Sequence, residues 1–302
     1  MKRTLLAALL AWSAAAFAQD FDKAEIKTTR VAEGVYMLEG VGGNIGVSAG
    51  EDGVILIDDQ FAPLTTKILA AIKAISDKPI RFVINTHWHF DHTGGNENLG
   101  KGGAVIVAHD NVYKRLSTDQ FIRLLNNRKV PALSREGLPV ITFSETITFR
   151  LNGDEITVYR IPPAHTDGDA MVRWKKANVV HTGDVFSAYR YPFIDVENGG
   201  SVLGTVRAMD KLLPTLDDNT KVIPGHGPLS TKKDVVAFRE MMAKSSSRVQ
   251  AAVKQKKTLQ EIVAMKPTRE FDEVWGKFRT GDGFAELLYY GFAPQKAHTH
   301  KK

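Results

Sequence analysis

The chain has 302 residues, of which 43% are hydrophobic and 25% are charged. This composition fits one large globular domain or two small ones and excludes a disordered chain. The net charge of +6 at pH 7 is not accompanied by a basic stretch interleaved with aromatic residues, so we expect no nucleic acid as partner. Cysteine is absent, which excludes disulfides, a thiol nucleophile and thiolate metal ligands.

Residues 1–18 predict an export signal, because Lys2 and Arg3 precede a short apolar run that ends at a small-x-small cleavage site. A membrane anchor would need a longer apolar run, about 20 residues for a spanning helix, so we expect no stable membrane insertion after the signal is removed. The mature chain would begin near Gln19 with a net charge of +4, because the removal of two basic residues lowers +6 by two. We therefore predict a periplasmic or secreted protein.

In chain order, short apolar runs alternate with amphipathic segments in the first half of the chain. Leu64, Ile68 and Ile72 recur at helical spacing, which predicts a helix over residues 63–76. Residues 110–128 predict a second, polar helix. The predicted strands of this half span residues 34–38, 43–48, 54–58, 80–84 and 104–108. Such an alternation of strands and helices indicates an α/β fold.

The second half of the chain is predicted to begin with strands and to end with helices. Its predicted strands span residues 146–151, 155–161, 172–174, 178–181 and 221–223. Asn152-Gly153 predicts a tight hairpin between the first two of them. A helix is predicted over residues 201–213, and the chain after Thr231 is predicted to be helical, with a capping box at Thr258-Leu-Gln-Glu261 and Asp282 as the cap of the last helix.

The segment Asn85–Gly95 follows the apolar strand 80–84 and holds four candidate metal ligands within six residues: His87, His89, Asp91 and His92. In an extended segment alternate side chains share a face, so the first three would project together, and the following turn could aim the fourth toward them. Imidazole nitrogen and carboxylate oxygen suit zinc, manganese or iron. A polar loop with solvated histidines is the alternative, but four such residues so close together favour a metal site.

Three later motifs supply further candidates, each just after a predicted strand. His165 lies in Pro-Pro-Ala-His-Thr-Asp, Asp184 in Thr-Gly-Asp-Val, and His226 in Pro-Gly-His-Gly-Pro. Each motif alone has an ordinary explanation as a turn. Their appearance in this order after the first motif makes a shared metal centre the better interpretation.

The pattern His-x-His-x-Asp-His, followed in order by these three motifs, resembles that of the metallo-β-lactamase superfamily from about Val31 to the C-terminal helices. The resemblance implies an αββα sandwich with extra C-terminal helices. Residues 19–230 would form the hydrolase domain, and residues 231–302 would form a helical extension packed on it.

The resemblance also implies two zinc ions per chain, with iron or manganese as alternatives. The implied ligands are His87, His89 and His165 for one ion, Asp91, His92 and His226 for the second, and Asp184 as the bridge between them. In similar proteins an acid at the position of Asp58 supports the metal loop, although a strand-end turn residue is the alternative here.

The resemblance implies a small-molecule substrate as partner. The implied reaction is attack of a metal-bridging hydroxide on the carbonyl of a cyclic or activated amide or ester, with a β-lactam as a candidate. Asp91 would orient the nucleophile or move its proton, and Asp184 would hold the two ions together.

Four alternatives to a β-lactam hydrolase remain open. The aspartate at 184 is more typical of glyoxalase II-like thioesterases and lactonases, whereas export argues against a cytosolic thioester. A mononuclear iron persulfide dioxygenase is disfavoured by the complete second set of ligands. Export disfavours a nuclease, and a metal-binding protein without catalysis would need a seventh ligand that we do not identify.

The aromatic segment after Asp184 is the predicted specificity element, since it could wall a pocket and receive an acidic substrate group. A loop packed on its own aromatic rings is the alternative. The predicted substrate contacts are Phe186, Tyr189, Arg190, Tyr191 and Phe193.

The other residues near these motifs are assigned to support. Trp88 is predicted to point away from the ligands, and His109 and His181 are predicted to be structural. His298 and His300 are assigned to a solvated tail.

Overall fold

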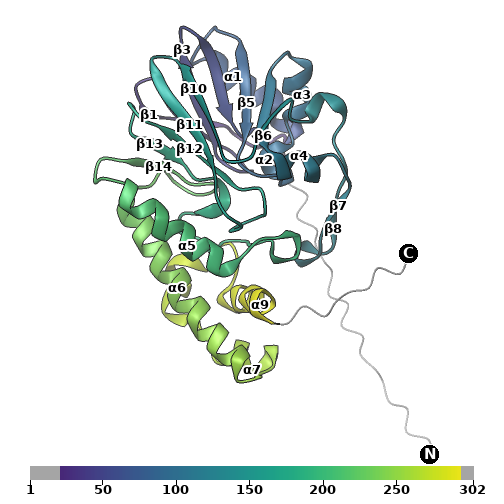
Figure 1. Cartoon of the computed structure of the whole chain (residues 1–302), viewed down its shortest axis with the longest axis vertical. Helices are drawn as coiled ribbons and strands as arrows, with labels where there is room; N and C mark the ends of the chain where they lie inside the picture. The colour runs from purple at the N-terminus through teal and green to yellow at the C-terminus, as the bar shows by residue number, and fades with distance from the viewer. Residues whose placement is uncertain (1–20, 294–302) are drawn as a thin grey trace, which may run out of the picture.

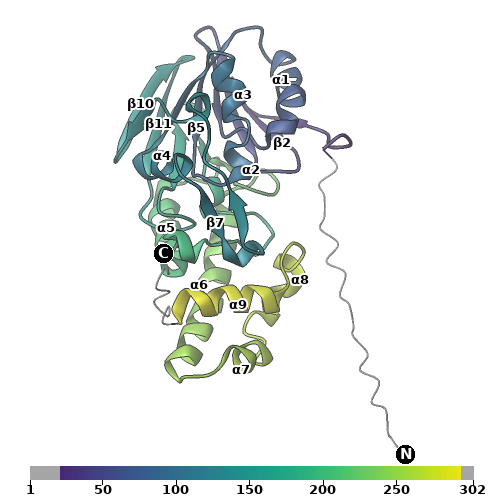
Figure 2. The same cartoon turned by 90° about the vertical axis from the view of Figure 1, so that its right-hand side faces the viewer.

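In the computed structural model of the protein, residues 21–293 are described; the predicted signal and the two tail histidines lie outside them. Two β-sheets pack face to face and helices cover both outer faces, so the predicted αββα sandwich is confirmed (Figure 1). The C-terminal helices α6 to α9 gather at one end of the sandwich in both views (Figures 1 and 2). Within the described residues no helix is both long and apolar enough to cross a membrane.

The first sheet has seven strands in the order β1-β2-β3-β4-β5-β6-β9. The strands β4, β5, β6 and β9 run parallel to one another, and the β1–β4 part is antiparallel. The bounds are β1 Lys27–Ala32, β2 Val35–Glu39, β3 Ile45–Gly50, β4 Gly53–Ile57, β5 Ile80–Asn85, β6 Val105–His109 and β9 Ile141–Phe143.

The second sheet has five strands in the order β10-β11-β12-β13-β14, with only β13 and β14 parallel. The bounds are β10 Thr146–Leu151, β11 Asp154–Arg160, β12 Ala170–Trp174, β13 Val179–His181 and β14 Lys221–Ile223. The predicted Asn152-Gly153 hairpin is confirmed, and both residues have a positive φ, as this turn requires.

Alternating side chains on the strands separate the apolar core into layers. On β4, Ile55 and Ile57 face the space between the sheets, whereas Val54 and Leu56 face the outer helix α1. On β13, Val179 packs between the sheets and Val180 packs toward the C-terminal helices. Since the side-chain period of a strand is two, a strand buried on both faces is apolar throughout, as these runs are.

The helices bury one apolar stripe each. The α-helices are α1 Thr65–Lys73, α2 Phe90–Thr93, α3 Asn96–Lys101, α4 Asp110–Leu116, α5 Val202–Leu212, α6 Lys232–Lys254, α7 Leu259–Ala264, α8 Asp272–Trp275 and α9 Gly281–Phe292. Phe238 and Met242 of α6 are fully buried in the same cluster as Val180 and Val222 of the second sheet, so the C-terminal helices share the core of that sheet.

Two helix caps were predicted, and one is correct. The capping box at Thr258 is confirmed, because its side chain accepts from the backbone of Glu261 and the Glu261 carboxylate accepts in return from Thr258 N. The last helix instead begins after Thr280, whose hydroxyl accepts from Gly283 N. Asp282 lies inside the first turn and forms an ion pair with Lys266, so its prediction as the cap was wrong.

The predicted helix over residues 110–128 is also wrong beyond Leu116. There the chain forms an antiparallel hairpin of β7 (Gln120–Ile122) and β8 (Arg128–Val130). Asn126 and Asn127 both have positive φ, which makes the turn, and strands of three residues are too short to show a period of two. The edge strands β1 and β9 were likewise not predicted.

Candidate metal centre

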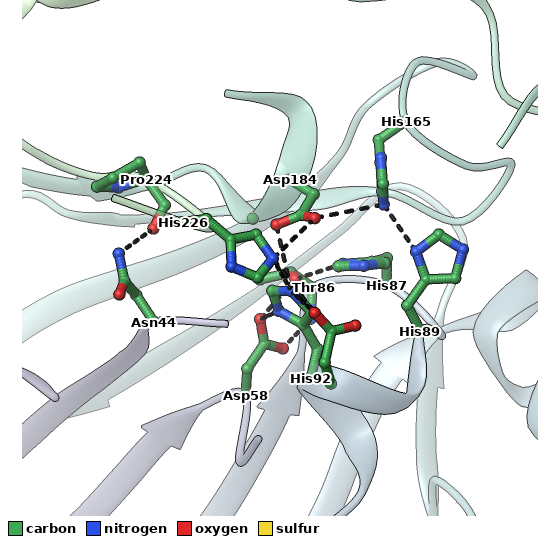
Figure 3. A network of polar contacts seen from close by, with 12 residues as sticks. Asn44, Asp58, Thr86, His87, His89, His92, His165, Asp184, Pro224 and His226 are labelled. Atoms are coloured by element: carbon green, nitrogen blue, oxygen red, sulfur yellow. Dashed lines mark hydrogen bonds and ion pairs between the residues drawn. The ribbon is translucent and has the colours of Figure 1, made fainter. Parts of the chain in front are cut away.

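The predicted ligands meet at one edge of the sandwich, where strands from both sheets end. Figure 3 shows their side chains converging from loops after β5, β11, β13 and β14. Carboxyl ends of parallel strands share one edge of a sheet, and here β4-β5 and β13-β14 are the two parallel pairs that meet. All seven residues that the sequence pointed to are therefore neighbours in space.

The segment after β5 is extended only as far as His89. The helical turn α2 begins at Phe90, earlier than predicted, so Asp91 and His92 lie on a helix and do not continue the alternation of an extended strand. His89 is the N-cap of this turn. The turn brings His92 deep into the site, where its side chain is completely buried.

One group of three histidines offers nitrogens that lie within 4.8 Å of one another: His87, His89 and His165. Nε2 of His165 is 2.8 Å from Nδ1 of His89. The other ring nitrogen of each histidine is held from outside. Nδ1 of His87 lies 3.0 Å from the Thr86 hydroxyl, Nδ1 of His165 lies 2.8 Å from the Phe193 carbonyl, and Nε2 of His89 lies 3.0 Å from Asp195 Oδ2. Such outer partners orient imidazoles for metal binding.

The chemistry of this group fits a metal ion. Nε2 of His87 is buried and has no hydrogen-bond partner within residues 21–293, a state that costs free energy unless a ligand satisfies the nitrogen. Burial, followed by the neighbouring histidines, lowers the pKa of His87 well below its usual value. Burial also lowers the pKa of His165 to about 4. Both imidazoles are thus neutral near pH 7, which is the form that binds metal.

A second group consists of Asp91, His92 and His226, whose ligand atoms also lie within 4.8 Å of one another. Nε2 of His226 is 3.3 Å from Asp91 Oδ2 and 3.3 Å from Nε2 of His92. Burial disfavours a charge on His92, yet the carboxylates of Asp184, Asp91 and Asp58 outweigh burial and raise its pKa well above the usual value. These carboxylates therefore stabilise a cation at this position, and a metal ion meets that need as well as a proton does.

Asp184 lies between the two groups (Figure 3). Its carboxylate is 3.2 Å from Nε2 of His226, 3.2 Å from Nε2 of His92 and 3.7 Å from Nε2 of His165. Burial opposes ionisation of Asp184, but His226 and His92 outweigh it and hold its pKa well below the usual value. An ionised carboxylate between two nitrogen-rich groups has the position and charge of a shared ligand.

Of the two roles left open for Asp58, its contacts favour support of the site. Its Oδ2 is 2.8 Å from Nδ1 of His92 and accepts from the Thr86 hydroxyl at 2.7 Å, and its Oδ1 accepts from Thr86 N at 2.7 Å. Both oxygens are occupied, so Asp58 acts as the outer partner of His92 although it also lies near His87. Its positive φ of 64° turns the chain out of β4 toward the site.

Sequence reasoning missed several residues that hold the ligands in place. Asp195 anchors His89, and Asp169 accepts from His165 N at 2.7 Å and from Thr166 N at 3.0 Å. The Asn44 amide donates to the carbonyls of Pro224 and Gly227, on both sides of His226. Asp169 and Asp195 follow ligand motifs closely in the sequence, and this position could have indicated that they hold the ligands. Nothing near Asn44 in the sequence indicates its role.

We predict that Asp195→Asn weakens metal binding by about 10- to 100-fold, as the loss of an outer partner typically does. The amide keeps the size of the side chain but removes the charge that orients His89. Competition with a chromogenic chelator measures the affinity. Circular dichroism should show an unchanged fold, and an unchanged metal affinity would contradict the role of Asp195.

Gly43 lies between β2 and β3 and directly against the site, because a Cβ at this position would overlap the imidazole of His92. We predict that Gly43→Ala displaces His92, lowers the free energy of unfolding by about 1–3 kcal/mol through overpacking, and weakens metal binding at the second group. Gly283→Ala is the control, since its Cβ would meet nothing nearer than 3.4 Å. Equal thermal unfolding and equal metal content in the two variants would contradict this account.

Two of the predicted substrate contacts lie in the core. Phe186 and Tyr191 are both 0% exposed. The Phe186 ring packs on Phe238 of α6, and the Tyr191 ring stacks on Phe284 of α9 with its hydroxyl donating to Asp272 at 2.7 Å. They anchor the C-terminal helices and do not reach a substrate, so these two predictions were wrong.

The other three predicted contacts lie at or near the surface. Tyr189 is 44% exposed and donates to Asp234. The Phe193 ring lies 5.9 Å from the ring of His89 and 6.2 Å from that of His165, measured between centroids. Arg190 is partly buried and stacks on Phe278, with its carbon Cζ 3.6 Å from the ring centroid. Phe193 is therefore the member of this segment whose ring lies near the candidate ligands, and Arg190 lies close enough to Asp184 and Asp91 for their charges to counteract the lowering of its pKa by burial.

The residues assigned to support take that role. Trp88 is fully buried and packs with Val112 and Leu116 of α4, but its ring also lies 4.5 Å from the ring of His89 between centroids, so it backs this ligand and does not point away from all of them. His109 caps α4, because its Nδ1 accepts from Asn111 N. His181 lies 3.1 Å from the Asn44 carbonyl and accepts from Gly183 N, so it braces the loop of Asp184.

Two groups of potential metal ligands at the strand ends of an αββα sandwich are the arrangement found in metal-dependent hydrolases. The family model of the metallo-beta-lactamase superfamily matches residues 38–226, more than half of the chain, and the chain belongs to this superfamily.

Relatives and solved structures agree with this assignment. The beta-lactamase-like protein 2 homolog of Caenorhabditis elegans is 22% identical over 232 residues, which cover 73% of this chain and 68% of the relative. A probable metallo-hydrolase of Methanocaldococcus jannaschii is 25% identical over 185 residues, which cover 59% of this chain and 84% of the relative.

A metallo-beta-lactamase from Pontibacter korlensis has the same fold with a TM-score of 0.58 at 20% identity, over 72% of this chain and 99% of that one. The sec-alkylsulfatase Pisa1 from a Pseudomonas species gives a TM-score of 0.67 at 15% identity. That match covers 91% of this chain but only 51% of the alkylsulfatase, so the chain spans about half of that enzyme.

Proposed function

We propose that the protein is an exported, dinuclear zinc-dependent hydrolase acting on a cyclic or activated amide or ester, with β-lactams among the candidate substrates. The observation that carries this proposal is the carboxylate of Asp184, which lies within 3.7 Å of histidine nitrogens from both groups. A single ion would need only one group. The presence of two groups and a carboxylate between them supports two ions.

The ligands would be His87, His89 and His165 for one ion and Asp91, His92 and His226 for the other, with Asp184 shared. Two zinc ions bound there would supply an activated water near neutral pH and polarise the substrate carbonyl. Nitrogen and oxygen ligands without sulfur also suit iron or manganese, so the identity of the metal as zinc is itself proposed. The signal-like sequence at the N-terminus supports export to the periplasm or beyond the cell.

Asp91 is our candidate for the residue that moves the proton. Its side chain is 21% exposed, compared with 11% for Asp184, so among the acidic ligands it has the better access to an incoming substrate. Burial opposes its ionisation, but His92 and His226 outweigh burial and lower the pKa of Asp91. An ionised Asp91 can accept a proton from the attacking water and pass it to the leaving group.

A lactonase or thioesterase is the second candidate, and the position of Asp184 favours it, since a bridging aspartate is typical of those branches. A sulfate ester is a further substrate class to test, because the alkylsulfatase match extends over 91% of this chain. A mononuclear iron persulfide dioxygenase would bind one iron ion and consume oxygen, so metal analysis and an oxygen electrode distinguish it.

The test is turnover of a chromogenic β-lactam, a lactone, a thioester and a secondary alkyl sulfate by the mature, zinc-loaded chain. Each assay has a chelator control and a control in which zinc is restored. Chelator-sensitive cleavage of the β-lactam would support antibiotic-type substrates. Cleavage of the esters alone would favour the second candidate, and no zinc-dependent turnover of any substrate would contradict the proposal.

A further inference from the structure

Two arginines from distant parts of the chain border the metal centre without a carboxylate partner. Arg190 follows the loop of Asp184, and Arg279 lies between α8 and α9 in the C-terminal helices. Within residues 21–293 neither guanidinium has a hydrogen bond or a salt bridge to another residue, and Nε of Arg279 is buried without a partner. A buried or half-buried guanidinium without a partner is costly, and natural structures normally pair it.

An aromatic ring contacts each of the two arginines. Cζ of Arg190 lies 3.6 Å from the ring centroid of Phe278, and Cζ of Arg279 lies 5.6 Å from that of Phe193. The Phe193 ring in turn lies 5.9 Å from the ring of His89. The ring contacts therefore lead from His89 through Phe193 to Arg279. Arg190 is linked to the site through the backbone instead, because Ala188 N, two residues earlier, donates to the carbonyl of His226 at 2.8 Å.

The C-terminal helices are fastened to the specificity segment at this point. Tyr191 N donates to the Trp275 carbonyl at 2.8 Å, and the Tyr191 hydroxyl donates to Asp272 at 2.7 Å. The turn that follows α8 carries Phe278 and Arg279, and the Phe278 ring is 63% exposed. Because Tyr191 is bonded to α8, the turn that carries the exposed Phe278 ring and the Arg279 guanidinium lies next to the specificity segment.

The charges around the pair favour an anion. Burial lowers the pKa of Arg190, and the carboxylates that counteract this effect are Asp184 and Asp91 of the metal centre itself. Once those two acids bind cations, little negative charge remains for the arginines. Burial also lowers the pKa of Arg279, and the charge of Glu286 on α9 counteracts this effect. No ion pair within 4.0 Å forms between Glu286 and Arg279.

We propose that Arg190 and Arg279 together bind an oxyanion group of the substrate, a carboxylate or a sulfate, while the exposed ring of Phe278 contacts an apolar part of the same molecule. This inference rests on the proposed function, because it places the anion next to the reacting centre. A guanidinium presents a planar fork of donors that matches such groups. The substrate class is then an anionic amide or ester with an apolar or aromatic portion.

The test measures binding of benzenesulfonate to the full-length, zinc-loaded protein by calorimetry, because a sulfonate is a weak metal ligand. Methyl phenyl sulfone is the uncharged probe of similar shape. We expect the sulfonate to bind more tightly than the sulfone. Arg190→Gln and Arg279→Gln should each lower the affinity for the sulfonate by roughly 10- to 100-fold. Arg279→Lys should restore part of the affinity, since it keeps the charge without the fork.

Arg207→Gln is the matched control, because Arg207 is an exposed arginine on α5 and loses the same charge far from the metal ligands in the chain. Its binding of the sulfonate and the metal content of all variants should equal those of the parent protein. Equal affinity for the charged and uncharged probes, or undiminished binding in both glutamine variants, would overturn the inference.

A second measurement separates this inference from the proposed function. For any ester that the protein hydrolyses, kcat/KM is compared with that for the same ester bearing a free carboxylate. Preference for the anionic ester that disappears in Arg279→Gln supports the inference. Hydrolysis without such a preference overturns it while the proposed function stands, and sulfonate binding through the arginines without any hydrolysis leaves the anion site but contradicts the function.

Discussion

Replacement of His226 with alanine is expected to reduce the bound metal from about two equivalents per chain to about one. His226 belongs to the second group only, where its Nε2 is 3.3 Å from Asp91 and 3.2 Å from Asp184. The first group keeps its three histidines, so one ion should remain. Hydrolysis should fall by at least about 100-fold, because even the loss of an outer partner of a metal ligand can cost that much.

Metal is counted by mass spectrometry after extensive dialysis, and the unfolding temperature shows whether the variant is folded. His109→Asn is the matched control, since it removes a histidine outside both groups and asparagine can still cap α4. The control should keep about two equivalents of metal. Two tightly held ions in His226→Ala would contradict the assignment of this ligand.

Asp184→Asn should weaken the binding of both ions and turnover together. The carboxylate lies within 3.7 Å of nitrogens from both groups, and Gly225 leaves it room that no larger residue would leave. Asparagine keeps the shape but removes the charge that two cations would share. We expect a loss of metal affinity of at least about tenfold at each site, and a loss of activity of at least about 100-fold at subsaturating zinc.

Zinc titration by calorimetry separates the two sites, and excess zinc should restore part of the activity if the defect is mainly in binding. Asp210→Asn is the control, because Asp210 is an exposed acid on α5 that pairs with Arg239. Unchanged metal affinity and activity in Asp184→Asn would make Asp184 a turn residue after all. Loss at one site alone would assign it to that site as an ordinary ligand.

The mistaken substrate contacts and the missed hairpin have different physical causes. Phe186 and Tyr191 look like pocket residues in the sequence, because a run of aromatic rings after a metal ligand has the same composition whether it lines a cavity or fills a core. Their burial is decided by α6 and α9, which begin 46 and 90 residues later: 232 minus 186, and 281 minus 191. The hairpin β7-β8 was missed because its strands are too short for periodicity to reveal them.

The sequence by itself indicated the family, the layered α/β architecture and the seven candidate ligands that the structure brings together. It could do so because the candidate ligands lie directly after strands, and strand ends of one sandwich meet at a common edge. Tertiary structure alone decided which acids hold the histidines, which aromatic residues are core, and that Arg279 lies beside the centre. These are contacts between residues far apart in the chain, such as Asp195 with His89, and no local pattern encodes them.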